Sequence, residues 1–170
     1  MAAAAPSIRT EPLSDRHDRN GFASGVEALD RYLRQQAGQD TRRRVASCFV
    51  LLAGNDRAPI GYYTLAATSL GLAELPEPLA KRLPRYPVVP AILMGRLAVD
   101  ARHRGRGNGE LLLFDAFSRA LRNEIASYAF VVDAKDATAA QFYHRYSFIP
   151  IVSGGRRLFI PMAEIAKIFV

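Results

Sequence analysis

The chain has 170 residues, of which 49% are hydrophobic, and this suits one domain with a single core. No stretch approaches the roughly 18 consecutive apolar residues of a membrane helix, and the N-terminus lacks a signal-peptide pattern. The single cysteine, Cys48, cannot form an internal disulfide, so we expect a cytoplasmic protein with an inert buried thiol.

The formal net charge of +7 is carried by twenty arginines against three lysines. Arginine suits phosphate, because its planar fork can bond two oxygens at once. Such a charge favours nucleic acid, an anionic membrane surface or an anionic cofactor, while arginine-rich codon usage is the neutral explanation. Charge alone does not choose among these.

In chain order, residues 1–20 are polar and are expected to form a mobile N-terminal segment, with a single domain over residues 21–170. The S-x-x-E pattern from Ser24 to Glu27 has the form of a capping box and predicts a helix ending near residue 36. Two strands joined by a turn-rich connection are expected over residues 45–53 and 59–67.

Five prolines in residues 71–90 predict an irregular loop with at most a short helix. A connection of this length in a small domain often serves a function, such as a lid or a wall of the substrate site. A strand over 91–99 then leads through an arginine- and glycine-rich loop into an amphipathic helix that ends near residue 121. Later elements are a strand at 128–133, a helix at 137–146, a strand at 157–160 and a short terminal turn within 163–170.

The loop between the central strand and helix has the features of a pyrophosphate site. The first N–H groups of a helix lack intrahelical partners, and Gly105, Gly107 and Gly109 let the backbone approach an anion. The spacing fits neither G-x-G-x-x-G nor the Gly-Lys-Ser/Thr of a P-loop. What stands here is Arg104-x-x-Gly107-x-Gly109, which on its own fits a solvated basic turn equally well.

That loop resembles the coenzyme A loop of the GNAT N-acetyltransferases, and four further stretches resemble the GNAT toxins that acetylate aminoacyl-tRNA. The similar stretches are S-G-V-E-A-L-D-R-Y-L from Ser24, I-G-Y-Y-T-L from Ile60, P-V-V-P with L-M-G-R-L-A-V-D from Pro87 to Asp100, and Q-F-Y-H-R-Y-S-F from Gln141. Ser24 and Ser147 depart from the cysteine and glycine that are usual in the family.

The resemblance implies an α/β GNAT fold, with one mixed sheet that splays between two central parallel strands and helices on both faces. It implies acetyl-CoA as cofactor. The residues implied to hold it are Leu97, Ala98 and Val99 at the thioester and pantetheine, with Arg102, Arg104, Gly105, Arg106, Gly107, Asn108 and Gly109 at the pyrophosphate.

The resemblance also implies that Tyr143 gives a proton to the coenzyme A sulfur, a role that suits a phenol with a pKa near 10. The alternative is an aromatic residue that only packs beside Phe142 and Tyr146. No general base is assigned, because none of the three histidines is an invariant ligand in a family motif and a free α-amino group titrates at about 7.7–8.0. No metal-ligand spacing is present.

The implied function is acetyl transfer to the amine of aminoacyl-tRNA, which blocks translation. The implied partners are charged tRNA and a ribbon-helix-helix antitoxin, with no membrane, and the sequence leaves open whether the chain forms a homodimer. Two basic clusters are expected to contact tRNA: Arg42, Arg43 and Arg44, and Lys81, Arg82 and Arg85. The alternatives are acetylation of a small amine or protein terminus, and a non-catalytic domain that binds nucleic acid or a partner.

Overall fold

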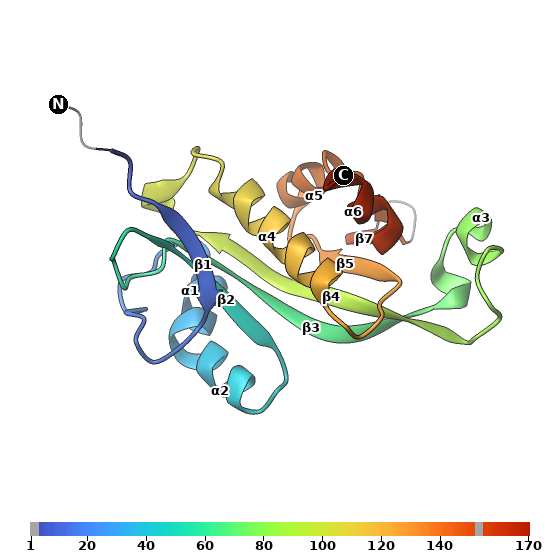
Figure 1. The fold of residues 1–170 in the computed structure, drawn as a ribbon, viewed down its shortest axis with the longest axis horizontal. Coiled ribbons are helices and arrows are strands. Elements are labelled where there is room, and N and C mark those ends of the chain that lie inside the picture. The colour runs from blue at the N-terminus through green and yellow to red at the C-terminus, as the bar shows by residue number, and fades with distance from the viewer. Residues whose placement is uncertain (1–3, 152–154) are drawn as a thin grey trace. The chain divides into compact units, whose positions relative to one another are not determined.

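The computed structural model describes residues 4–151 and 155–170 (Figure 1). Its strands follow the order β1-β2-β3-β4-β5-β7-β6 in one sheet that mixes antiparallel and parallel pairs, which confirms the α/β expectation. The chain divides into two compact units. Unit 1 contains residues 1–65 and 96–116, and unit 2 contains residues 66–95 and 117–170.

Unit 1 begins with strand β1 (Ile8–Pro12), which runs antiparallel to β2 (Ser47–Ala53). The prediction of a mobile segment over residues 1–20 is therefore wrong for this strand. The polar sequence Arg9-Thr10-Glu11 gave no apolar pattern from which a strand could be predicted, because an edge strand needs little apolar surface to pair. β2 also pairs antiparallel with the first half of β3 (Gly61–Gly71).

The helical stretch of unit 1 is longer than the sequence predicted. It consists of α1 (Glu27–Arg31), a π-helical turn (Tyr32–Gln36) and α2 (Ala37–Arg42). The prediction of a capping box was wrong, because the N-cap residue is Val26, whose side chain forms no capping hydrogen bond. The hydroxyl of Ser24 instead donates a hydrogen bond to Asp30. Gly25, at a φ of 92°, turns the chain between Ser24 and the helix, so the spacing of a capping box is lost.

The core of unit 1 lies between this helical stretch and strands β2 and β3. Fully buried members are Leu33, Val50, Leu52 and Tyr62, and Cys48 is buried with them. Burial raises the pKa of the Cys48 thiol to about 12, which confirms an inert thiol. The end of β4 (Val88–Val99), a 3₁₀ turn (Ala101–His103) and the start of α4 (Asn108–Arg122) complete the unit.

Unit 2 holds the remainder of β3, β4 and α4. The proline-rich segment contains a 3₁₀ turn (Leu72–Glu74) and the short helix α3 (Glu77–Ala80), as expected. β4 pairs in parallel with β5 (Ala129–Asp133), in a register that ends at Met94 opposite Val132. β5 pairs antiparallel with β7 (Arg157–Pro161), and β7 pairs antiparallel with β6 (Ile149–Pro150).

The remaining helices of unit 2 are α5 (Ala137–His144) and α6 (Met162–Ile168), the second of which replaces the expected terminal turn. Phe117, Phe130 and Phe148 form an aromatic cluster with ring centroids 5.0–6.1 Å apart. A second core packs Leu70, Val89 and Phe159 with their neighbours. No helix in the described residues is long and apolar enough to span a bilayer.

Candidate functional site

The loop from Asp100 to Asn108 in unit 1 is anchored by the buried carboxylate of Asp100. This side chain, 1% exposed, accepts hydrogen bonds from the N–H groups of Ala23 and Arg102 and from the Arg102 guanidinium. The bond from Arg102 is the main reason that the pKa of Asp100 falls to about 2. Arg102 is therefore partly engaged within the protein, although its side chain remains 71% exposed.

Arg104 ties the loop to the turn before α1. Its Nη2 donates to the carbonyl oxygen of Ser24, and a Cβ at Gly25 would lie 2.8 Å from that nitrogen. Ser24 is buried, and its N–H and Oγ both donate to Asp30. The sequence did not indicate this chain of contacts, since the arginine and its acceptor are 80 residues apart.

The tip of the loop presents backbone donors and one unpaired cation. Gly105 and Gly107 have φ of 73° and 79°, a conformation that other residues adopt with strain, and a Cβ on either would meet no atom within 4 Å. Within the described residues, the N–H groups of Gly105, Arg106 and Gly107 donate no hydrogen bond, and the exposed Arg106 side chain has no ion pair.

The loop ends where α4 begins. Asn108 is buried, and its Nδ2 donates to the carbonyl oxygen of His103, which closes the loop from Arg104 to Gly107. Helix α4 is 15 residues long, so its first N–H groups and its dipole carry substantial positive potential. Together with the glycine tip, this arrangement can hold an anionic group such as a pyrophosphate.

Strand β4 leads into this loop through Leu97, Ala98 and Val99, of which Ala98 is buried in the core of unit 1. These residues lie beyond the part of the strand whose register with β5 is defined. Gly61 of β3 approaches the same stretch closely: a Cβ there would lie 3.1 Å from the Ala98 carbonyl oxygen and 2.9 Å from Leu112. A methyl group at this position would therefore be crowded by the Ala98 carbonyl oxygen.

Tyr143 lies in unit 2 on α5, whose first turn is capped by Asp136. The residue is only 7% exposed, and its ring packs edge-on against Phe142 and Phe148 at 5.2 and 5.3 Å. Burial raises the pKa of its phenol, so the hydroxyl stays protonated at neutral pH.

The hydroxyl of Tyr143 donates to no acceptor among the described residues. Its proton is therefore not committed to a hydrogen bond within that part of the chain. A packed ring whose hydroxyl keeps its proton available is consistent with a proton donor. Packing and proton donation, opposed in the sequence analysis, are thus compatible at this residue.

Ser147 is one of the two departures from the resembled motif, and its backbone conformation shows why glycine is usual at this position. It has a φ of 71°, in the left-handed region that glycine occupies without strain, and this accounts for the glycine that is usual there. The backbone N–H groups of Tyr146 and Phe148 both bond the Tyr143 carbonyl oxygen around this bend. The α5 turn therefore closes with serine in place of glycine.

The two basic clusters have different local structures. Arg42 ends α2 and Arg43 caps it, so these cations also interact favourably with the helix dipole. Arg44 follows at a φ of 59°, and all three are exposed. In unit 2, Lys81 is paired with Glu77 at 3.0 Å, whereas Arg82 and Arg85 are exposed without an ion pair in the described chain.

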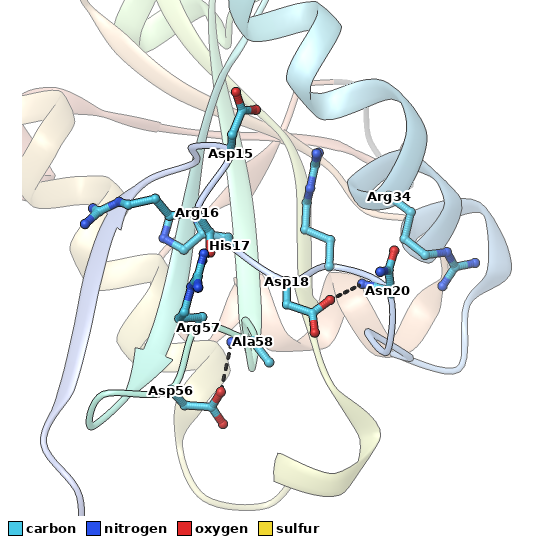
Figure 2. Close-up of a pocket in the computed structure, with 10 residues that line it drawn as sticks. Asp15, Arg16, His17, Asp18, Asn20, Arg34, Asp56, Arg57 and Ala58 are labelled. Carbon is cyan, nitrogen blue, oxygen red and sulfur yellow. Dashed lines mark hydrogen bonds between the residues drawn. The ribbon is translucent and has the colours of Figure 1, made fainter.

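The histidines and a pocket in unit 1 do not suggest further chemistry. His17 is buried, with one ring nitrogen 2.6 Å from Glu11 and the other bonded to the Ser14 N–H, so neither is available as a base. The pocket in Figure 2 is lined by the loop 15–20, Arg34 and the turn 56–58 and contains no residue of the glycine loop. No group of three potential metal ligands occurs among the described residues.

The chain matches the model of the acetyltransferase (GNAT) domain over residues 91–168. It is 36% identical over 138 residues to a tRNA-acetylating toxin of Mycobacterium tuberculosis (strain ATCC 25618 / H37Rv), an alignment that covers 80% of this chain and 81% of the relative. A mutant of KacT has a similar structure, with a TM-score of 0.89 at 28% identity over 95% of this chain and 99% of KacT.

AtaT complexed with acetyl-methionyl-tRNAfMet is also similar, with a TM-score of 0.86 at 29% identity over 96% of this chain and 100% of AtaT. AtaTR bound with acetyl-CoA has a TM-score of 0.84 at 27% identity, over 96% of this chain and 98% of that one.

Proposed function

This chain belongs to the GNAT acetyltransferase family, within its branch of tRNA-acetylating toxins, and we propose that it transfers acetyl from acetyl-CoA to the α-amino group of an aminoacyl-tRNA. The product can no longer be used normally in translation, so the chain acts as a toxin. We propose that residues 21–170, together with the edge strand β1, form one catalytic domain and that it works in the cytoplasm, where charged tRNA is found.

The loop before α4 is the observation that carries the cofactor assignment. Arg102, Arg104, Arg106 and the N–H groups from Gly105 to Gly109 would bind the pyrophosphate, with Arg106 as the cation of this loop that has no competing partner among the described residues. Arg102 and Arg104 would contribute mainly through the loop conformation that they stabilise. Asn108 would act through its bond to His103.

Leu97, Ala98 and Val99 would offer backbone groups to the pantetheine arm and to the developing oxyanion. Tyr143 would give its proton to the departing sulfur of coenzyme A, a role supported by a phenol that is protonated at neutral pH and donates no hydrogen bond among the described residues. The acceptor amine needs no strong base, because a free α-amino group has a pKa of about 7.7–8.0 and is already largely neutral at slightly alkaline pH.

The tRNA would be held by the exposed cations Arg42, Arg43 and Arg44 and by Lys81, Arg82 and Arg85. We further propose a ribbon-helix-helix antitoxin as the neutralising partner, with a homodimer as one oligomeric state open to test. The antitoxin proposal is supported by the complex of the similar AtaT toxin with the C-terminus of its antitoxin AtaR.

The test is incubation of the protein with labelled acetyl-CoA and total tRNA in two forms, charged and chemically deacylated. We expect label only on the charged pool, and its loss from tRNA under the mild base that cleaves aminoacyl esters. Label on a small amine or a protein N-terminus, with none on charged tRNA, would favour the alternative acceptor. No transfer to any amine would favour a binding domain.

A further inference from the structure

Arg96 in β4 is a partly buried cation without an acidic partner. Its guanidinium carbon lies 3.5 Å from the centroid of the Tyr32 ring. Within the described residues, the Arg96 side chain forms no ion pair and no hydrogen bond. A guanidinium has five N–H donors, and an aromatic face beneath it satisfies none of them. The fork of Arg96 is thus open to an anion.

The ring beneath Arg96 is held from two sides. The Tyr32 hydroxyl donates to Asp40 at 2.8 Å, and its ring stacks on Tyr62 with centroids 6.3 Å apart and planes at 15°. The Tyr62 hydroxyl in turn donates to the carbonyl oxygen of Leu29. Tyr32 is also the first residue of the π-helical turn, a distortion that often accompanies functional sites. Arg96 is therefore positioned by a rigid aromatic platform.

The position of Arg96 along β4 limits the source of the anion. It precedes Ala98 by two residues, or about 7 Å at a strand rise of about 3.3 Å per residue. The proposed pyrophosphate loop begins after Val99, on the opposite side of Ala98 along the chain from Arg96. The charges of coenzyme A are on its phosphates, so a second anion beside the acetyl group would belong to the acceptor.

We propose that Arg96 binds the phosphodiester of the 3′-terminal nucleotide of aminoacyl-tRNA and so positions the amine for transfer. This inference rests on the proposed function. The amino acid is esterified to the terminal ribose, so this phosphate is the anion nearest to the amine. Arginine suits it because two parallel N–H groups can bond two phosphate oxygens. The carboxylate of a free amino acid or peptide would offer the same chemistry.

The test compares two minimal acceptors, 3′-O-aminoacyl-adenosine with and without a 5′-phosphate, together with charged tRNA. The wild-type protein should prefer the phosphorylated acceptor, and Arg96→Gln should reduce that preference about 10- to 100-fold, the range for a charge-assisted hydrogen bond. Arg96→Lys should restore part of it. With charged tRNA, Arg96→Gln should raise KM more than it lowers kcat and reduce the logarithmic salt slope by about 0.7.

Arg122→Gln provides a matched control, because Arg122 is exposed at the end of α4 and forms no ion pair among the described residues. It should leave the preference and the salt slope unchanged, and Tm should show that each variant is folded. An unchanged preference and an unchanged salt slope in Arg96→Gln would overturn the assignment of Arg96 and leave the proposed function intact. If Arg96→Gln instead loses a wild-type preference for a free amino acid over its amide as acceptor, the anion that Arg96 binds would be a carboxylate. No transfer to charged tRNA by the wild-type protein would overturn the proposed function as well.

Discussion

Tyr143 and Asp100 are both buried, and the pKa of each departs from its usual range. The pKa of Tyr143 is raised, which favours its neutral form, and the pKa of Asp100 is lowered, which favours its ionised form. Burial raises the pKa of the Tyr143 phenol, which is neutral at pH 7, whereas hydrogen bonds from Arg102 lower the pKa of the Asp100 carboxyl, which is ionised at pH 7. The first condition suits a proton donor, and the second suits a structural anchor for the loop that follows β4. Each residue can be tested by an isosteric change that removes one property.

Tyr143→Phe should retain acetyl-CoA binding and lose most of the transfer activity, because it removes the hydroxyl and keeps the ring that packs on Phe148. General acid catalysis typically contributes about 10²- to 10⁴-fold. Single-turnover rates with charged tRNA, measured beside a binding titration with acetyl-CoA, separate the two effects. Near-wild-type turnover would return Tyr143 to a packing role.

Asp100→Asn should destabilise the fold at neutral pH by about 2 kcal/mol, the value of a carboxyl pKa lowered from 3.8 to about 2. Because the folded-state pKa is depressed, the ionised carboxylate stabilises the protein fully above about pH 4–5. This contribution is lost as pH falls through about 2. Urea unfolding of both proteins should therefore give a difference at pH 7 that shrinks towards pH 3, and a constant difference would refute this ion-pair account.

The glycine loop and the helix after it were largely predictable, because a strand, a glycine-rich turn and an apolar helical face are local patterns. Strand β1 was not, since its residues show little alternation and pair only at an edge. The Ser24–Asp30 and Arg104–Ser24 contacts also escaped prediction. Each depends on the positive φ of Gly25 or on residues far apart in sequence, which no short spacing records.

The loop before α4 predicts a charge-specific effect at Gly107. Asparagine and aspartate have nearly the same shape, and both tolerate positive φ better than most residues. If the pyrophosphate lies at this tip, Gly107→Asp should lose much more acetyl-CoA affinity than Gly107→Asn. Calorimetric titration of both variants would show this, with circular dichroism as the check on folding. Equal losses would mean that backbone strain, and not phosphate proximity, explains the effect.

The end of α2 predicts a tRNA contact. Replacing Arg42, Arg43 and Arg44 with alanine should weaken activity on charged tRNA and flatten its salt dependence, by somewhat under one unit of logarithmic slope per lost phosphate contact. Acetyl-CoA affinity should stay nearly unchanged. Because these residues also interact with the helix dipole, unfolding must be measured in parallel. If the triple variant acetylates charged tRNA as well as the wild type at every salt concentration, the cluster is only a solvated surface.

As a whole molecule, the chain combines a basic surface charge with a cofactor loop and a proton donor, and each has a distinct place in one reaction. In the proposed function the net charge of +7 would attract a polyanion, the loop would hold the acetyl donor, and the phenol would assist the leaving sulfur. The similarity to tRNA-acetylating toxins connects these parts to one acceptor, since a small amine would not require the exposed arginines.

The central claim is best tested by the mass of the 3′-terminal fragment of charged tRNA after reaction. Charged tRNA is incubated with the protein and acetyl-CoA and digested with a nuclease that releases the aminoacyl-adenosine. We predict a fragment heavier by one acetyl group on the amine, present with the wild-type protein and nearly absent with Tyr143→Phe. An aminoacyl-adenosine of unchanged mass, from protein shown to bind acetyl-CoA, would contradict the proposed function.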